Sequence, residues 1–193
     1  MPGLREQKIA KAKVLIQECA LRLFAEQGYS KTTVEQIAEA AEVSSSTFFR
    51  YFQTKEAAAL YDSLDPVIIE AFSRQPGDLS VIQALRNATR ETFGNLPADK
   101  QKLEMQRFEL LRAVPELRAK MYEEMVRSID LLAHCIGERA GKDPTSIEIQ
   151  NLAGAIIGVG MAALLRVYKH SAQVDLVSAF DAALARLETG LEI

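Results

Sequence analysis

Hydroxyl side chains within residues 33–54 mark the starts of three helices, the first two of them short. Thr33 is placed to cap the first helix, Ser44 or Ser45 the second, and Thr54 the third, because Ser and Thr oxygens accept hydrogen bonds from the free N–H groups at a helix start. The middle helix can then be no longer than about two turns, and a helix that short is unstable by itself. The segment must therefore fold by packing against neighbouring helices.

The middle helix has one apolar side and one outward side. Phe48 and Phe52, four residues apart, can bury the apolar side in a core. The outward side carries Ser45, Ser46, Phe49 and Arg50. A helix, a tight turn and a second short helix fit a helix-turn-helix, whose second helix presents its first residues to base edges in the DNA major groove. Hydroxyls can bond to bases or phosphates, and a phenyl ring can contact a thymine methyl. The periodicity alone is equally compatible with a small surface hairpin in an all-helical protein.

The residues around this motif resemble a known family. Between residues 11 and 60, the run LFAEQGYSKTTVEQIAEAAEVSSSTFFRYFQTKEAAAL is similar to the N-terminal domain of the TetR family of transcriptional regulators. The shared features are Gly-Tyr, Thr-Thr, Ile-Ala, Val-Ser, Thr-x-x-x-Tyr-Phe and Lys-Glu at fixed spacings. The resemblance covers the first quarter to third of the chain.

The resemblance implies roles in DNA binding for seven residues. The family's base-reading positions fall on Ser45, Ser46 and Phe49, and its phosphate-contacting positions fall on Thr33, Thr47, Tyr51 and Lys55. The family often has Lys-Gly or Lys-Ala where this chain has Ser45-Ser46, and usually has Tyr where it has Phe49. One cation and one hydroxyl of the usual set are therefore replaced.

The charge distribution is compatible with DNA binding, although the net charge of −3 does not indicate it. Residues 1–55 carry eight Lys or Arg against six Glu, a balance of +2, and the remaining residues carry a balance of −5. The first helix, expected over 8–27 and ended by Gly28, has a basic leading end: Arg5, Lys8, Lys11 and Lys13. These side chains could lie beside a phosphate strand or be solvated at a frayed terminus.

The remaining sequence predicts helices throughout, so we expect an all-α protein of about nine helices. We expect an N-terminal helix-turn-helix domain, 1–54, followed by a larger helical bundle, 55–193. The TetR resemblance implies that the bundle serves effector binding and dimerisation. The expected later helices run from Thr54 through Phe72 with a kink at Pro66, over 79–95, over 98–113, from Pro115 to Ala140, from an N-cap at Asp143 with Pro144 at the first helical position, and over about 174–187.

The last two helices are expected to meet a partner subunit. Residues 152–165 contain no charge, yet fourteen apolar residues are fewer than the roughly 20 that span a membrane. Gly154 and Gly158 weaken this helix by about 1 kcal/mol each relative to Ala, which indicates a close approach by another backbone or a ligand. The TetR resemblance implies a four-helix interface between two subunits; a monomeric core is the alternative.

The resemblance also places an effector pocket inside the C-terminal bundle. Seven apolar residues on the helices that would surround it are Phe72, Phe93, Met105, Phe108, Met121, Met125 and Ile129. Few charged residues share these helix faces, so we expect an apolar or amphipathic effector. Each residue, taken singly, is also compatible with an ordinary core position.

No sequence motif indicates an enzyme, a cofactor or a metal site. The chain lacks a P-loop, a dinucleotide-binding glycine turn and a nucleophile elbow, and neither histidine has partners at metal-ligand spacing. Cys19 and Cys135 lie far apart inside helical patterns, and Cys19 fits a packed core thiol better than a redox sensor. The polar, basic start is no signal peptide, so a cytoplasmic protein outside the membrane is expected.

The sequence therefore predicts a homodimeric regulator that binds double-stranded DNA and a small-molecule effector. Repression of a palindromic operator is the mode common in the family. A helical adaptor that binds proteins and no specific DNA is the rival hypothesis. The effector, the operator and the regulated genes are not indicated by the sequence.

Overall fold

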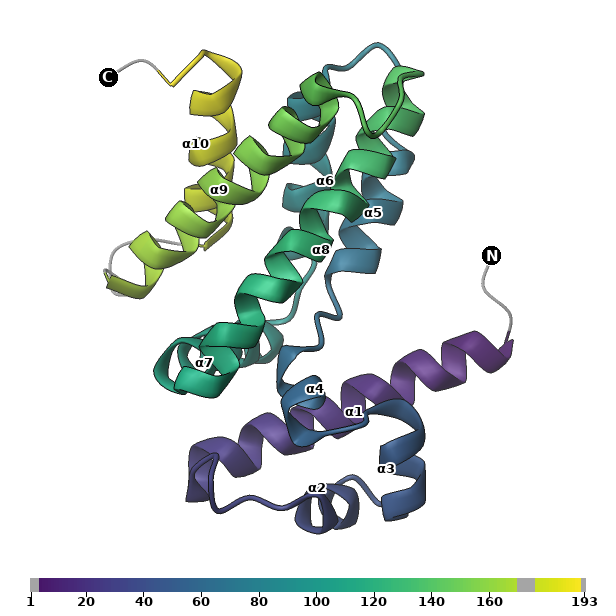
Figure 1. The fold of residues 1–193 in the computed structure, drawn as a ribbon, viewed down its shortest axis with the longest axis vertical. Helices are drawn as coiled ribbons and strands as arrows, with labels where there is room; N and C mark the ends of the chain where they lie inside the picture. Colours follow the sequence, from purple (N-terminus) through teal and green to yellow (C-terminus); the bar gives the residue numbers. More distant parts are fainter. Residues whose placement is uncertain (1–3, 170–175, 192–193) are drawn as a thin grey trace. The chain divides into compact units, whose positions relative to one another are not determined.

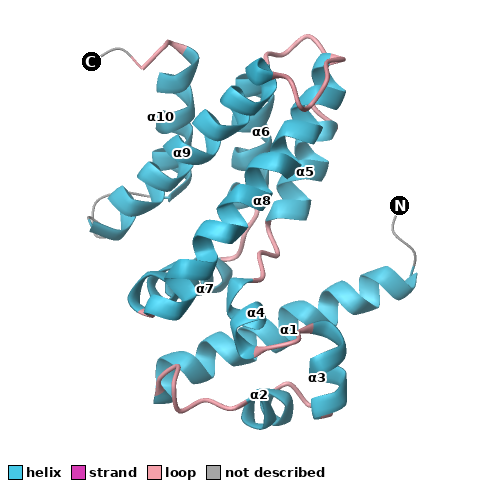
Figure 2. Cartoon of the chain, in the orientation of Figure 1, coloured by secondary structure: helices cyan, strands magenta, loops and turns pink. Residues whose placement is uncertain are grey.

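A computed structural model describes residues 4–169 and 176–191, which form ten α-helices and no strand (Figures 1 and 2). The predicted all-α class is confirmed. In chain order the helices are α1 Leu4–Gln27, α2 Val34–Ala40, α3 Ser45–Tyr51, α4 Lys55–Leu60, α5 Asp65–Ser73, α6 Val81–Gly94, α7 Ala98–Ala113, α8 Pro115–Ala140, α9 Ile147–Lys169 and α10 Leu176–Glu188.

The chain forms two compact units that divide it differently from the predicted domains 1–54 and 55–193. The first unit contains residues 1–63 together with 98–121, and the second contains 64–97 together with 122–193. Helix α7 and the start of α8 therefore pack with the helix-turn-helix, because Leu111 and Leu117 enter the same core as α1–α4. The unit that contains the motif is larger than the sequence pattern indicates.

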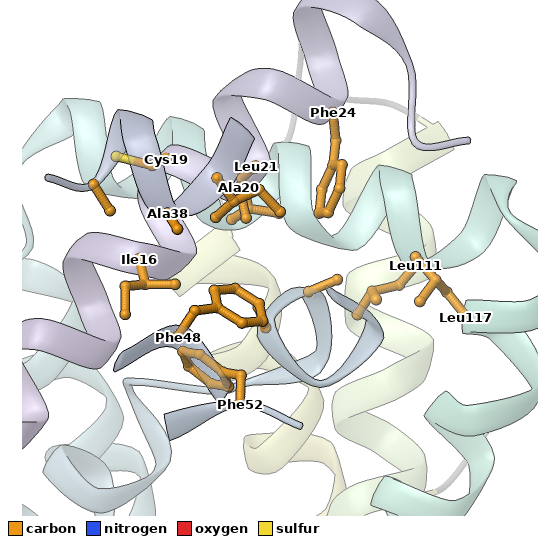
Figure 3. Packing of buried hydrophobic residues seen from close by; sticks show 14 residues of the cluster. Ile16, Cys19, Ala20, Leu21, Phe24, Ala38, Phe48, Phe52, Leu111 and Leu117 are labelled. Carbon is orange, nitrogen blue, oxygen red and sulfur yellow. The ribbon is translucent and has the colours of Figure 1, made fainter. Parts of the chain in front are cut away.

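The core of the first unit is built around α3. Phe48 is fully buried and Phe52 is 4% exposed, and their ring centroids lie 5.9 Å apart. Figure 3 shows the two rings beside Ile16 of α1. Burial of a phenylalanine contributes about 1.5–3 kcal/mol, which α3 needs because seven residues are too few for a stable isolated helix. The predicted packing of Phe48 and Phe52 is confirmed.

One predicted helix is wrong as a continuous element. The segment after Thr54 was expected to kink at Pro66, but α4 ends at Leu60 and α5 begins at Asp65. Pro66 lies in the first turn of α5, where its missing N–H has no helical partner to lose. The break comes earlier, where Tyr61 leaves the helical conformation with ψ of 126°. This division makes ten described helices where about nine were expected.

Side chains from two other helices stabilise the non-helical segment between α4 and α5. The Gln17 amide of α1 donates a hydrogen bond to the Tyr61 carbonyl. Arg107 of α7 donates to the Leu60 carbonyl at 3.3 Å and pairs with the Asp62 carboxylate at 2.5 Å. The carbonyls at the end of α4 thus bond to side chains rather than to a following helical turn.

The start of α9 also differs from the prediction. Asp143 and Pro144 were expected to begin the helix, but the helix begins at Ile147. The Asp143 carboxylate instead accepts hydrogen bonds from the backbone N–H and the hydroxyl of Thr145, both at 2.8 Å. This local turn competes with a helical N-cap. The expected start of the last helix at Val174 lies outside the described residues.

The second unit has its own core on α5, α6, α8, α9 and α10. Its buried members are Ala71, Phe72, Ala84, Leu85, Ala88, Ala133, Ile136, Ile149, Ala153, Ile156 and Leu184. Arg139 of α8 bonds to the loop that follows α5. It donates to the carbonyls of Gln75 and Leu79 at 3.1 Å, and its guanidinium stands 5.4 Å from the Phe72 ring centroid. Arg86 pairs with Asp181 at 2.9 Å and joins α6 to α10.

Helix α9 keeps much of its apolar surface uncovered. Only 22% of its most apolar window is buried within the described chain. By length and composition the helix could cross a bilayer, but core helices of soluble proteins can have the same length and apolar composition. Gly158 is exposed, and no atom of the described residues outside its local backbone lies within 4 Å of the position that a Cβ would take at Gly154 or Gly158.

Candidate nucleic-acid interface

The turn between α2 and α3 is fixed by backbone hydrogen bonds. Glu42 adopts the left-handed conformation with φ of 54° just after the end of α2. The Val43 N–H then reaches the Ala38 carbonyl at 2.9 Å, and the Glu42 N–H reaches the Glu39 carbonyl at 3.0 Å. This pair of bonds is a Schellman ending, which normally uses glycine. The chain therefore turns sharply into α3 without a flexible loop.

The start of α3 presents hydroxyl groups around its free N–H groups. The Ser44 oxygen caps the helix by accepting from the Thr47 N–H at 3.1 Å, so the cap is Ser44 rather than Ser45. The Ser44 hydroxyl also lies 2.8 Å from that of exposed Ser46. Ser45, in the first turn, is partly exposed. Two small hydroxyl side chains at a helix start leave room for close approach to a polar surface.

Phe49 is the one large apolar side chain that α3 exposes. Half of it is accessible, and its ring meets the buried Phe48 ring edge to face with centroids 5.7 Å apart. The buried Phe48 ring therefore orientates the exposed Phe49 ring. The structure therefore brings Ser45, Ser46 and Phe49 together on the outward part of α3, as the sequence pattern predicts.

The four predicted phosphate-contacting residues come from three helices: Thr47 and Tyr51 lie on α3 itself, Thr33 at the start of α2 and Lys55 at the start of α4. Thr33 is exposed and closes a capping box on α2, where its oxygen accepts from the Gln36 N–H at 3.3 Å. The partly buried Thr47 accepts from the Ser44 hydroxyl at 3.0 Å. Tyr51, in the last turn of α3, accepts from Arg50 at 3.4 Å. Each side chain thus has a local contact that orientates it.

Lys55 has a stronger attachment than the sequence indicates. Its ammonium donates to the carbonyls of Tyr29 and Thr32 at 2.8 and 3.0 Å and stands 4.3 Å from the Tyr29 ring centroid. The loop after α1 is therefore tied to the start of α4. The Tyr29 hydroxyl bonds to the Glu56 carboxylate, and burial together with this bond raises the pKa of Tyr29 well above its ordinary value. The tyrosine stays a donor at neutral pH.

Arg50 is absent from the predicted contact set, although the pattern places it on the outward side of α3. The guanidinium lies 4.9 Å from the Tyr51 ring centroid. With Tyr51 it lines an open groove shared with Arg5, Lys8, Ile9 and Lys13 of α1. The sequence contained a signal for this residue, because it is the only cation in α3.

Two family models match successive parts of the chain. A model described as bacterial regulatory proteins of the tetR family matches residues 16–60, which contain α2, α3 and α4. A model described as the MftR C-terminal domain matches residues 79–192, more than half of the chain. The chain belongs to the TetR family of transcriptional regulators. It is accordingly a DNA-binding transcriptional regulator, and the predicted resemblance is confirmed.

Relatives within the TetR family match over different lengths. The chain is 35% identical over 149 residues to the transcriptional regulator TcmR of Streptomyces glaucescens. The matched region covers 74% of this chain and 66% of TcmR. It is 26% identical over 186 residues to MftR of Mycobacterium tuberculosis. This match covers 92% of this chain and 89% of MftR. The match to TcmR therefore spans slightly less than two thirds of that protein. These relatives are transcriptional regulators rather than enzymes.

Solved TetR-family structures share the fold. The crystal structure of Thermus thermophilus FadR, a TetR-family repressor in complex with lauroyl-CoA, has 24% sequence identity and a TM-score of 0.60. The match covers 94% of this chain and 95% of FadR. Among the residues described here, no three His, Cys, Asp or Glu side chains gather as a metal site.

The predicted effector residues are divided between the two units. Phe72, Phe93, Met125 and Ile129 belong to the second unit, and Met105, Phe108 and Met121 to the first. Phe72 is 2% exposed and lies in the second core, where Ile129 packs against it. Phe93 is 8% exposed and stacks on Phe180 with centroids 6.3 Å apart. Met121 packs against the first core.

The double attachment of Lys55 leads to a stability prediction. Lys55→Met keeps the length of the side chain but leaves the Tyr29 and Thr32 carbonyls without their donor. We expect the free energy of unfolding to fall by about 1–2 kcal/mol, because hydrogen bonds to charged groups contribute about 1.5–3 kcal/mol and this site is partly solvated. Urea denaturation of the purified protein measures the change.

The control for this experiment is Lys31→Met, at an exposed lysine of the same loop. Its effect on unfolding should stay within about 0.5 kcal/mol, as for ordinary surface substitutions. Equal stability of the two variants would show that the Lys55 ammonium does not hold the loop.

Proposed function

We propose that this TetR-family protein is a homodimeric repressor that binds a palindromic operator and is released by a small apolar or amphipathic effector. The observation that carries the proposal is the outward part of α3, where Ser45, Ser46 and Phe49 are presented by a helix that is capped at Ser44 and anchored by Phe48. Such a regulator acts in the cytoplasm, where the DNA is.

Base reading is assigned to Ser45, Ser46 and Phe49, and phosphate contact to Thr33, Thr47, Tyr51 and Lys55. The support is local geometry: the first set is grouped on one side of α3, and the second lies at helix ends, where polar groups and backbone N–H donors meet phosphates. Contacts to base edges discriminate between sequences, whereas contacts to phosphates do not.

A pair of substitutions tests this assignment. Phe49→Ala should change the preferred base at one operator position, because a base contact is worth about 1–3 kcal/mol of discrimination. Tyr51→Phe, which removes only the hydroxyl, should weaken binding to all duplexes by a similar factor. The measurement is a selection from random DNA fragments with each variant, followed by titration of the enriched and a scrambled duplex. Thermal unfolding checks that both variants are folded.

The assignment of Phe49 fails if its variant loses the same factor on enriched and scrambled duplexes. Lys55 is a poorer probe of phosphate contact, since its substitution also disturbs the loop after α1. Its effect on DNA must be read from the salt dependence of binding, which a purely structural role leaves unchanged.

Dimerisation is assigned to α9 and α10. The support is the uncovered apolar surface of α9 and the open space beside Gly154 and Gly158 within one described chain. Glycines let two helix backbones approach closely. Two reading helices must sit about 34–36 Å apart, or a multiple of it, to meet successive turns of the major groove, so a monomer would make half the contacts.

Gly158→Leu tests the dimer. In an isolated chain a leucine here meets open space and removes glycine's helix cost of about 1 kcal/mol. In a dimer packed through Gly158 it overfills the interface, at a cost of about 1–3 kcal/mol. We expect a folded variant that dissociates at higher concentration than the parent and binds operator weakly. Analytical ultracentrifugation and operator titration measure both effects.

The contrasting variant is Gly160→Leu on the same helix. A Cβ at Gly160 would stand 3.1 Å from the Phe180 ring in its own chain. This substitution should lower the stability of the subunit, whereas Gly158→Leu should lower only that of the dimer. A Gly158→Leu protein that is dimeric and fully competent for DNA would place the interface elsewhere.

The effector pocket is centred on the second unit, near Phe72, Phe93, Met125 and Ile129. These apolar side chains come from α5, α6 and α8, and the charges of Arg86, Arg90 and Arg139 are engaged by carboxylates or carbonyls. Lauroyl-CoA bound to Thermus thermophilus FadR is a precedent for an amphipathic ligand in this fold. Met105, Phe108 and Met121 would then stabilise the first unit rather than contact the ligand.

A thermal-shift screen tests the chemistry of the effector. We expect fatty acids, acyl-CoA esters or other amphipathic compounds to stabilise the protein and to lower its affinity for operator DNA. Met125→Ala should reduce the shift, while Met105→Ala, at another partly buried methionine that lies in the first unit, should retain it. Stabilisation by polar anions alone would contradict the proposal.

The helical adaptor remains the alternative function, favoured by the exposed apolar surface of α9. The random-fragment selection separates the two hypotheses. A parent protein that enriches no shared sequence would be an adaptor rather than an operator-binding regulator.

A further inference from the structure

A basic groove lies between the leading half of α1 and the last turn of α3. It is open, has a volume of about 680 Å³ and is lined by Arg5, Lys8, Ile9, Lys13, Arg50 and Tyr51. Four of these six side chains are cations, and none of the described residues that line the groove carries a carboxylate. The α1 residues share one helix face, because they are separated by three, four and eight positions from Arg5.

The cations of the groove differ in exposure and in their contacts within the chain. Lys13 is partly buried, and its ammonium lies 5.7 and 5.3 Å from the ring centroids of Phe52 and Tyr61. Arg5, Lys8 and Arg50 are exposed, and Arg50 rests on the Tyr51 ring. An arginine braced by an aromatic ring loses less freedom when it binds an anion, and its planar group can bond to a phosphate with two N–H donors.

The position of the groove favours DNA as its occupant. Tyr51 and Arg50 end the helix whose first turn carries Ser45, and six residues of helix rise place Tyr51 roughly 9 Å from Ser45. Successive base pairs are about 3.4 Å apart, so this length corresponds to a few base pairs. A surface of cations that continues from a base-reading helix matches the phosphate strand beside the bases read.

We propose that this groove binds backbone phosphates that flank the bases read by α3, with Arg50, Lys8 and Arg5 as the contacting cations. The proposal rests on the proposed function and extends the operator contact of each subunit from the helix-turn-helix to α1. Lys11, an exposed lysine of α1 that does not line the groove, takes no part.

The test is the salt dependence of operator binding by the full chain. The probe is a duplex enriched from random fragments by the parent protein and titrated between 50 and 200 mM KCl. Each lost phosphate contact lowers the slope of log affinity against log salt by about 0.9, which is roughly a 3- to 4-fold difference over this salt range. Lys8→Gln and Arg50→Gln should each lower the slope by about this amount. The matched control Lys11→Gln should keep the parent slope.

A second measurement locates the contact. Removal of the outer base pairs of the duplex should weaken the parent protein, and it should have little effect on a variant that combines Arg5→Gln, Lys8→Gln and Arg50→Gln. Circular dichroism and thermal unfolding verify that these exposed substitutions leave the fold intact.

The outcomes separate the two proposals. Equal slopes for the Lys8 and Lys11 variants on an enriched duplex, or equal sensitivity of the parent and the triple variant to shortening, would overturn the groove as a phosphate site while leaving operator binding intact. A parent protein that enriches no duplex would overturn the proposed function and the groove with it.

Discussion

Burial of the Phe48 side chain is the interaction on which the DNA-binding unit depends. Helix α3 has seven residues and cannot persist alone, so its conformation is determined by the core into which Phe48 and Phe52 insert. The same burial decides what α3 exposes. Because Phe48 points inward, the side of α3 with Ser46 and Phe49 must face outward, and the Phe48 ring orientates Phe49 from below. The burial of Phe48 therefore both stabilises α3 and determines which of its residues face outward.

Polar side chains then connect elements that the core does not reach. Lys55 ties the loop after α1 to α4, and Arg107 joins α7 to the end of α4. In both cases a cation bonds to backbone carbonyls that a helix end or a loop leaves free. Glu104 completes the Arg107 site at 2.8 Å, and burial raises the pKa of this carboxyl despite the neighbouring cation. Helix α7 thus stabilises the unit that contains the helix-turn-helix.

The surfaces left over after folding have opposite chemistry in the two units. In the first unit, cations of α1 and α3 line a groove in which the described residues supply no carboxylate, and this charge fits a polyanion. In the second, α9 exposes apolar surface and glycines, which fits another protein surface. Under the proposed function, the first surface would contact the operator, and the second would join two subunits so that their reading helices lie at a set spacing.

The sequence alone determined the helices with strong caps and the outward residues of α3, since these depend on local spacing: Thr33 caps α2, Phe48 is buried and Phe49 is exposed, as predicted. Tertiary structure decided what depends on distant partners. The break after Leu60 is stabilised by Arg107, forty-seven residues away, and no local signal marks it. The Lys55 ammonium bonds to carbonyls twenty-three and twenty-six residues earlier, and only the folded chain places Arg50 in a groove with residues of α1. Periodicity reports which side of a helix is apolar, but only packing determines which polar groups meet across it.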